Sequence, residues 1–277
     1  MSLSILPSLD DDEYESDEHP ELKPDLEALR DLVYTRIGRK ITSCQKVTRG
    51  TYHVLNTEDG RRLIARLCRS PRNPSALRSE AATMTLVRSR SSIPVPVIHF
   101  LEDSPSNGVG MQFFVMDYVE GVNLYRIWDD LKLKHKKDVL TQIAWVLGQL
   151  ANMEFKATGS VAEDGSVGPL LHHMVENIDG KEVIKDMSDG PFGSTSDYLS
   201  LFIDRFSSSS SISEENRMRL YKVRNILANY FASHDKEPYI RPPFRLRHAD
   251  FDGQNLLFAD PTLNDGTSPP RLVGVID

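Results

Sequence analysis

The sequence predicts an α+β protein in which a part rich in antiparallel strands precedes a mainly helical part. Residues 44–69 alternate polar with apolar or β-branched side chains on both sides of Asp59-Gly60, a pair typical of hairpin turns. From about residue 122 onward, apolar residues recur mostly at helical spacing. The 277 residues are enough for one large domain or for two lobes that share a cleft.

The composition is that of a soluble globular protein, with 39% hydrophobic and 26% charged residues. The net charge of -7 argues against nucleic acid or an anionic membrane as a partner, because both bind basic surfaces. No apolar run approaches the roughly 18 residues of a transmembrane helix, and the first residues lack the features of a signal peptide. We therefore expect a cytoplasmic protein in which Cys44 and Cys68 are reduced thiols in half-buried strands.

The beginning of the sequence is strongly acidic. Residues 9–25 carry a dense run of carboxylates with few apolar side chains. Such a stretch buries too little surface to offset its ordering entropy, so residues 1–23 are expected to form a disordered tail. The other interpretation is an acidic interaction arm.

The strand-rich part begins with an amphipathic helix at 24–38, where a glycine stops the apolar pattern. Three antiparallel strands follow within 44–69, and a second helix covers 74–90. The prolines of 91–103 forbid a helix and favour an extended segment at a sheet edge. A strongly apolar strand at 109–121 completes the order helix, three strands, helix, two strands.

The helical part opens with a helix at 135–155. Its apolar side chains form one stripe that we expect to pack into a core, namely Val139, Leu140, Ile143, Val146, Leu147 and Leu150. Residues 157–196 are rich in glycine and turn residues, which predicts little regular structure. Helices return at 196–206 and 213–235, and two short strands around the loop 261–270 form a closing hairpin.

Residues 245–260 place four polar residues in one short run, namely His248, Asp250, Asp252 and Asn255. Asp250 and Asn255 have the spacing D-x-x-x-x-N, and His248 precedes at H-x-D spacing, which is the pattern of a kinase catalytic loop. The carboxylate can orient an acceptor hydroxyl and take its proton, while the amide oxygen can hold a magnesium ion. The alternative is an ordinary polar turn whose side chains satisfy backbone donors.

Three further residues fit the same chemistry. A magnesium site needs a second carboxylate, and the hairpin would fold Asp277 back beside Asn255. Arg66 lies in the third predicted strand and Glu80 in the helix that follows, so these two side chains can pair beside the phosphates. The alternative for this pair is a surface ion pair, which contributes little to stability.

Residues 247–258 (RHADFDGQNLLF) and 274–277 (GVID) resemble the catalytic and metal-binding motifs of the aminoglycoside phosphotransferase family. The likeness is greatest to the fungal members of this protein-kinase-like superfamily. Residues 92–98, 155–170 and 190–199 resemble further segments of the same subgroup. The resemblance runs from about residue 40 to the last residue.

The resemblance implies a two-lobed protein-kinase-like fold with an antiparallel-sheet N-lobe at 24–118 and a mainly helical C-lobe at 119–277. It also implies ATP and Mg²⁺ as cofactors and transfer of the ATP γ-phosphate to a hydroxyl of a small molecule. By position, Asp250 is then the catalytic base, and Asn255 and Asp277 are the metal ligands.

On the nucleotide side, the resemblance makes Arg66 and Glu80 the pair at the phosphates. The hinge backbone at Asp117 and Val119 then meets the adenine. Two features depart from protein kinases. Arg66 replaces the usual strand lysine, and Gly50 is the one glycine in a phosphate loop that has three in those enzymes.

Family members continue beyond the aspartate at which this sequence ends, so the resemblance predicts a truncated, incomplete C-lobe. In that case, apolar faces of the helices at 135–155 and 213–235 are exposed, and Asp277 is poorly held. The expectation is a marginally stable protein with weak or no activity.

Two other functions compete with a small-molecule kinase. A metal hydrolase that uses Asp250 and Asp252 needs further ligands, and His172-His173 lies in a predicted loop without partners at ligand spacing. A kinase-like pseudoenzyme or fragment would act through nucleotide or protein binding. The acceptor stays open, because antibiotic, choline-like, sugar and amino-acid hydroxyls are all used with the same catalytic loop. The oligomeric state stays open as well.

Overall fold

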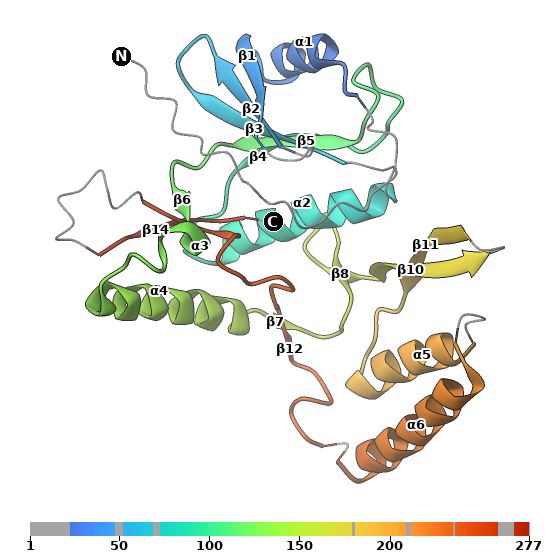
Figure 1. Cartoon of the computed structure of the whole chain (residues 1–277). Coiled ribbons are helices and arrows are strands. Elements are labelled where there is room, and N and C mark those ends of the chain that lie inside the picture. The colour runs from blue at the N-terminus through green and yellow to red at the C-terminus, as the bar shows by residue number, and fades with distance from the viewer. Residues whose placement is uncertain are drawn as a thin grey trace. The chain divides into compact units, whose positions relative to one another are not determined.

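The computed structural model describes residues 23–47, 52–68, 73–178, 181–208, 212–234, 236–259 and 269–276. The predicted acidic tail up to residue 22, Gly50 and Asp277 lie outside the described residues. The chain divides into two compact units, one formed by Met1–Ala81 with Val95–Glu120 and the other by Ala82–Pro94 with Gly121–Asp277. Figure 1 shows both units, with their helices and most of their strands labelled.

The first unit opens with helix α1, Leu26–Ile37. The carboxylate of Asp25 accepts hydrogen bonds of 3.0 Å from the backbone N–H groups of Glu27 and Ala28, which satisfies two free donors of the first turn. Gly38 ends the helix in the left-handed conformation at φ 66°. The predicted helix and its glycine stop are confirmed.

A five-stranded antiparallel sheet forms the core of the first unit. Its order is β1-β2-β3-β5-β4, so β3 is central and β4 lies at an edge, as the prolines before it predicted. Helix α1 packs on the sheet, with Leu29 and Val33 buried against Leu55, Ala65 and Phe113. The bounds are β1 Ile41–Lys46, β2 Tyr52–Thr57, β3 Arg62–Leu67, α2 Pro74–Arg90, β4 Ile98–Glu102 and β5 Phe113–Asp117.

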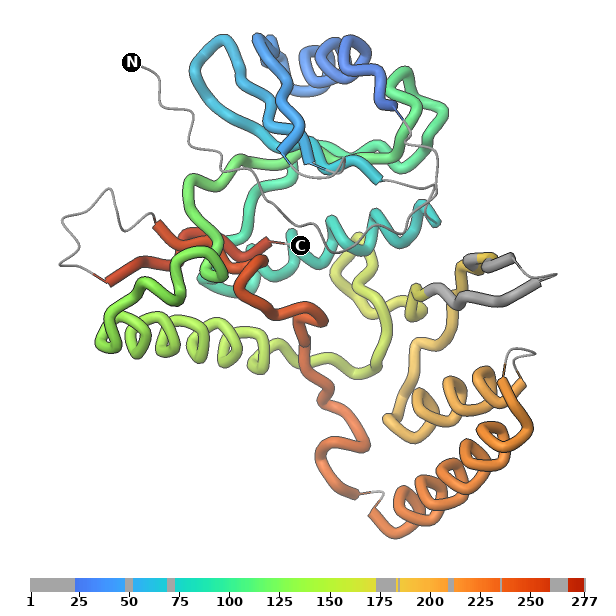
Figure 2. The backbone as a smooth tube through the Cα atoms, in the orientation of Figure 1, coloured from blue at the N-terminus to red at the C-terminus, as the bar shows by residue number. Residues whose placement is uncertain are grey.

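The second unit combines helices with several small sheets. In one of them β13 lies between β14 and β6, so that segments far apart in the sequence meet (Figure 2). The predicted closing hairpin is thus confirmed. The bounds are β6 Val122–Asn123, α3 Leu124–Ile127, α4 Leu133–Ala151, β7 Glu154–Phe155, β8 Ser160–Val161, β9 Val167–Gly168, β10 Leu170–Ile178, β11 Lys181–Asp189, α5 Thr195–Ser208, α6 Glu214–His234, β12 Phe244–Arg245, β13 Leu256–Phe258 and β14 Leu272–Val275. Within the described ranges, no helix is both long and apolar enough to cross a membrane.

The prediction of little regular structure at 157–196 is wrong. β8 and β9 form a short hairpin, and β10 and β11 pair antiparallel along nine residues each. In the sequence these two stretches flank Asp179-Gly180, a hairpin-type turn pair that the surrounding glycine-rich composition concealed. His172 and His173 therefore lie on a strand rather than in a loop.

Helix α4 carries only part of the predicted core stripe. Val139, Val146 and Leu150 are buried, whereas Leu140 and Leu147 are 52% and 47% exposed. Each of the two leucines follows a buried valine by one position, a rotation of about 100° around the helix axis that takes it off the buried face. The last two residues of the predicted helix form β7 instead.

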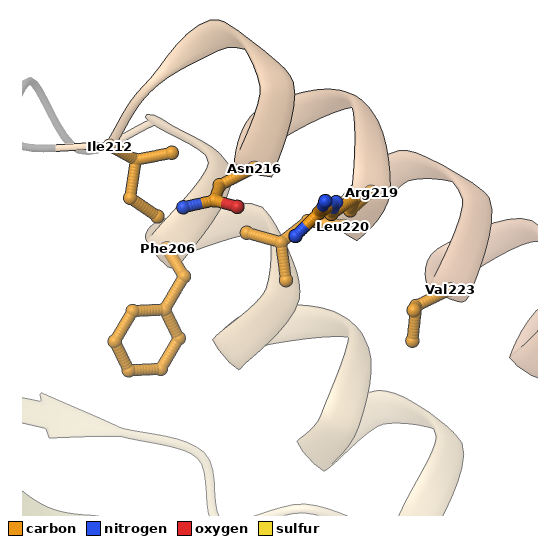
Figure 3. Close-up of a pocket in the computed structure, with 6 residues that line it drawn as sticks. All are labelled: Phe206, Ile212, Asn216, Arg219, Leu220 and Val223. Carbon is orange, nitrogen blue, oxygen red and sulfur yellow. The ribbon is translucent and has the colours of Figure 1, made fainter.

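Helices α5 and α6 lie side by side (Figure 2). The hydroxyl of Ser213 accepts a 3.3 Å hydrogen bond from the Asn216 N–H and so caps α6. An open pocket of about 290 Å³ is lined by Phe206, Ile212, Asn216, Arg219, Leu220 and Val223 (Figure 3). Other large apolar side chains of α6 are also exposed, namely Met218, Tyr221, Ile226 and Tyr230. The expected exposure of apolar residues on α4 and α6 is therefore present.

Candidate active site

A polar loop, residues 246–255, connects β12 to β13 and carries Asp250, the predicted catalytic base, and Asn255, a predicted metal ligand. At its start β12 pairs with β7, with Phe244 opposite Phe155 and Arg245 opposite Glu154. At its end β13 is the middle strand of a three-stranded sheet. Strand pairing therefore fixes both ends of the polar loop.

Asp250 and Asn255 are in direct contact within the polar loop. Asn255 Nδ2 donates to the backbone oxygen of Asp250 at 2.9 Å and to its carboxylate Oδ2 at 3.2 Å. Because the amide nitrogen serves these bonds, Oδ1 is the atom of Asn255 that can accept a proton donor or ligate a cation. Asp250 is exposed.

The other two polar residues of the loop make local contacts. Asp252 Oδ1 accepts a 2.6 Å hydrogen bond from the Gln254 N–H, and its backbone oxygen accepts one of 3.2 Å from the Asn255 N–H. This is the geometry of a polar turn, so Asp252 fits the alternative interpretation, in which side chains of the loop satisfy backbone donors. The ring of His248 packs edge-on against Phe251 at 5.4 Å between centroids.

Two residues at the junction of β6 and α3 donate hydrogen bonds to the backbone of the polar loop. Asn123 Nδ2 donates to the backbone oxygen of Gln254, and the Tyr125 N–H donates to that of Gly253 at 3.1 Å. A Cβ added at Gly253 would lie 3.0 Å from the Tyr125 nitrogen, so the close approach favours glycine. Sequence reasoning missed this loop strap, formed by Asn123 and Tyr125. An asparagine before a helix predicts a cap, yet its side chain makes no cap bond here.

The hairpin β13–β14 brings the end of the chain toward Asn255. The Ile276 N–H donates to the Asn255 backbone oxygen at 3.0 Å. Gln142 of α4 fixes the start of β14, because its amide donates to the Pro270 oxygen at 2.9 Å and accepts from the Leu272 N–H at 2.8 Å. The residue before the predicted metal ligand Asp277 is therefore beside Asn255, whereas Asp277 itself lies outside the described residues.

In the first unit, Arg66 of β3 and Glu80 of α2 form the predicted pair. Arg66 Nη1 lies 2.8 Å from Glu80 Oε1 and 3.0 Å from Oε2. The two side chains are only 12% and 19% exposed. They are therefore not the weak surface ion pair of the alternative interpretation, since solvent screens this contact far less.

The predicted hinge residues Asp117 and Val119 lie at and just after the end of β5. The Asp117 N–H donates to the Val97 oxygen at 2.9 Å, and its carboxylate accepts from the Val97 N–H at 3.3 Å. The same carboxylate lies 2.8 Å from His99 Nε2. Asp117 is thus held to the segment that enters β4, while Val119 is half-buried.

Arg62 supports the hinge from β3. Its backbone oxygen accepts a 3.3 Å hydrogen bond from the Tyr118 N–H, and its guanidinium lies 4.1 Å from the Tyr118 ring centroid. Arg62 also pairs with Glu120. The hinge therefore has side-chain support from both neighbouring strands of β5. Gly50, the predicted phosphate-loop glycine, lies outside the described residues.

A hydrolase-type metal cluster has no support in the described residues. No group of three or more His, Cys, Asp or Glu side chains there could hold a metal ion. His172 has a partner that its spacing did not reveal, because its Nε2 lies 2.9 Å from Asp189 Oδ2, and Arg205 binds the other oxygen of that carboxylate. These contacts join β10 and β11 to α5. Cys44 lies half-buried on β1, as predicted, whereas Cys68 is buried and follows the end of β3; the two are not joined in a disulfide.

A sequence profile described as the phosphotransferase enzyme family matches residues 46–277. The chain belongs to this family. The match includes Arg66, Glu80, the hinge and the polar loop, and it confirms the resemblance to aminoglycoside phosphotransferases.

Fungal proteins are among those with a similar sequence. Two subtelomeric hrmA-associated cluster proteins, from two strains of Aspergillus fumigatus, are each 30% identical to it over 146 residues. The match covers 51% of this chain and 26% of each relative, so the similar region is about a quarter of those proteins.

Solved structures have the same fold. A candidate aminoglycoside phosphotransferase from Ralstonia eutropha matches with a TM-score of 0.53 and 17% identity over 92% of this chain, which spans 64% of that protein. Aminoglycoside phosphotransferase APH(4)-Ia matches with a TM-score of 0.51 and 16% identity. The match covers 91% of this chain and 71% of the APH(4)-Ia chain. The predicted fold class, α+β and protein-kinase-like with an antiparallel-sheet N-lobe, is confirmed.

Proposed function

We propose that this chain is a small-molecule kinase that transfers the γ-phosphate of ATP to a hydroxyl group. The observation that carries the proposal is the contact of Asn255 with Asp250 inside a loop fixed at both ends, in a chain of the phosphotransferase enzyme family. That contact joins the residue types that phosphoryl transfer needs, a carboxylate for the acceptor proton and an amide oxygen for a metal.

Asp250 is the catalytic base in this proposal. The acceptor hydroxyl oxygen forms a bond to the γ-phosphorus while the bond from that phosphorus to the β–γ bridging oxygen breaks, and ADP leaves with the bridging oxygen. Asp250 orients the hydroxyl and takes its proton. Two observations support this role: Asp250 is exposed, and its carboxylate accepts a hydrogen bond from Asn255 in a loop whose ends are held by strand pairing.

Asn255 and Asp277 are the proposed magnesium ligands. Oxygen atoms of amides and carboxylates are the ligand types that magnesium prefers, and the bonds of Asn255 Nδ2 to Asp250 leave Oδ1 for such a role. When bound, magnesium would neutralise charge on the ATP phosphates. The hydrogen bond between Ile276 and Asn255 supports the assignment of the next residue, Asp277, to the same site.

The proposed nucleotide contacts lie on the first unit. Arg66, held by Glu80, meets the phosphates, and Gly50 belongs to the loop that covers them. The backbone of Asp117 and Val119 meets the adenine. We assign Arg66, Gly50 and Asp117 to an N-lobe at 24–118, and Val119 and the polar loop to a C-lobe at 119–277.

The partner in this proposal is a small molecule of unassigned identity, not a nucleic acid or a membrane, in keeping with the net charge of -7. The proposed location is the cytoplasm, in keeping with Cys44 and Cys68, which are not joined in a disulfide. The second candidate is a kinase-like protein that binds nucleotide without catalysis. Arg66 in the place of the usual lysine favours it, because the guanidinium fork differs in geometry from an ammonium group.

The test measures ATP binding and product formation on the same protein. Melting temperature is recorded with ATP and Mg²⁺, where ligand at about 100 times Kd stabilises the native state by about 2.7 kcal/mol. Mass spectrometry then detects a phosphorylated product from a panel of aminoglycoside, sugar, choline-like and amino-acid acceptors. A raised melting temperature with product supports the kinase, and a raised melting temperature without product from any acceptor supports the binding protein. No change in either contradicts both.

A further inference from the structure

Arg66 lies between two aromatic residues on adjacent strands. In the sheet register Tyr52 of β2 is directly opposite Arg66, and Arg66 is directly opposite Phe114 of β5. Directly paired residues on adjacent strands project from the same face of a sheet. One face of the sheet thus presents Tyr52, Arg66 and Phe114 in a row, with the arginine in the middle.

Both rings are within interaction distance of the guanidinium. The guanidinium carbon is 5.9 Å from the Tyr52 ring centroid and 5.6 Å from that of Phe114. Cations within about 6 Å of a ring centroid are attracted by the ring face. The side chain is only 12% exposed, so water screens this attraction little.

Two different nitrogens of Arg66 are held by hydrogen bonds. Nε donates to the Tyr52 hydroxyl oxygen at 3.1 Å, while Nη1 lies within 3.0 Å of both carboxylate oxygens of Glu80. A planar group held at two of its three nitrogens cannot rotate about its long axis. The direction of the third nitrogen, Nη2, is therefore set by Tyr52 and Glu80 together.

This arrangement suits arginine and not lysine. A lysine has no nitrogen at the Nε position of arginine and no plane to fix, so the Tyr52 hydroxyl would lose its bond in the Arg66→Lys variant. Phosphate recognition by arginine depends on the orientation of the guanidinium plane, because the strong contact uses two parallel N–H bonds.

We propose that Tyr52 is a positioning residue that orients Arg66 toward the phosphates of ATP. The inference rests on the proposed function, since it assigns Arg66 to those phosphates. Glu80 supplies the opposite charge to the guanidinium, and Tyr52 adds the orientation that an arginine requires and a lysine does not.

The test is calorimetry of Tyr52→Phe with two ligands, ATP with Mg²⁺ and adenosine, which lacks phosphates. The phenylalanine keeps the ring and removes only the hydroxyl. We expect ATP affinity to fall on the order of tenfold, as for loss of a hydrogen bond to a charged group, and adenosine affinity to stay unchanged. Tyr34→Phe is the matched control, because this tyrosine is on α1 and 60% exposed.

A double-mutant cycle separates orientation from a general effect. In the Arg66→Lys background the Tyr52 hydroxyl has no Nε to hold, so adding Tyr52→Phe should cause no further loss of ATP affinity. An equal loss in both backgrounds would overturn the proposal, as would equal losses for ATP and adenosine. If the unmodified chain binds ATP and Tyr52→Phe binds it equally well, the proposal for Tyr52 fails alone. If the unmodified chain binds no ATP, the nucleotide assignment fails and the proposal for Tyr52 fails with it.

Discussion

The side-chain amide of Asn255 donates to the backbone oxygen of Asp250 at 2.9 Å and to its carboxylate at 3.2 Å. The proposed metal ligand and the proposed base are therefore one hydrogen-bonded unit. A change at either residue alters the position of the other, so substitutions must be chosen to separate the two roles.

Asp250→Asn keeps the shape of the side chain but removes its ability to take a proton. We expect kcat to fall on the order of 100-fold to 10,000-fold, the usual effect of losing a positioned base, while ATP affinity stays largely intact. Turnover and calorimetry on the same preparation measure the two quantities. Asp252→Asn is the matched control, because the amide oxygen that replaces its carboxylate can still accept from the Gln254 N–H. Near-normal turnover of Asp250→Asn would rule out its assignment as the base.

Asn255→Ala should weaken ATP binding more in the presence of magnesium than in its absence. The reason is that Oδ1 is proposed to contact the metal and not the adenine. Calorimetry with and without magnesium measures the difference, and Gln254→Ala, a change at an exposed neighbour, serves as the control. Equal losses under both conditions would leave Asn255 as a turn residue only.

The loop strap gives a third prediction. Asn123→Ala removes the side-chain bond to Gln254 and should lower the free energy of unfolding by about 1 kcal/mol. The strap sets the position of the polar loop and not of the proposed adenine contacts, so we expect kcat to fall while the Kd for ATP without magnesium is unchanged. Asp25→Ala, which removes the two cap bonds at the start of α1, is a control for a loss of stability of about 1 kcal/mol alone. A variant as active as the unmodified chain would show that strand pairing alone positions the loop.

Local patterns predicted the contacts that depend on few residues. The D-x-x-x-x-N spacing brings Asp250 and Asn255 together because a five-residue separation closes within one turn of a loop. Similarly, Asp59-Gly60 sets the register of β2 with β3, which places Arg66 where it can reach the next helix. In both cases the chain between the partners is short, so backbone geometry leaves few alternatives.

Contacts between distant segments could not be predicted in this way. Asn123 and Gln254 are 131 positions apart, and no periodicity links the end of β6 to the polar loop. Likewise, the amphipathic pattern of α4 includes Leu140 and Leu147, yet which neighbours cover a helix face is a property of the whole fold. The pairing of β10 with β11 was missed for a different reason, because the glycine-rich composition was given more weight than the turn pair Asp179-Gly180 between the two stretches.

His53 provides a test of the first unit that is independent of catalysis. It lies on β2 with 4% exposure, and its Nδ1 has no hydrogen-bond partner among the described residues. Burial lowers the pKa of this imidazole below its ordinary value of 6.5, and the charge of Lys46 on the neighbouring strand lowers it further. The folded protein therefore binds a proton here less readily than the unfolded chain does.

The sign of the pH effect follows from this difference. Below about pH 6.5 the unfolded chain is protonated at His53 while the folded protein is not, so acidification favours unfolding until the pH passes the lower, folded pKa. We expect the stability lost between about pH 7.5 and about pH 5 to be smaller in His53→Gln than in the unmodified chain, since glutamine does not titrate. Urea unfolding at several pH values measures it, and subtraction of the two curves removes the groups that both proteins share. His234→Gln, at the end of α6, is the control for a histidine outside the core. Parallel curves for His53→Gln and the unmodified chain would mean that His53 takes up its proton as easily in the folded sheet as in the unfolded chain.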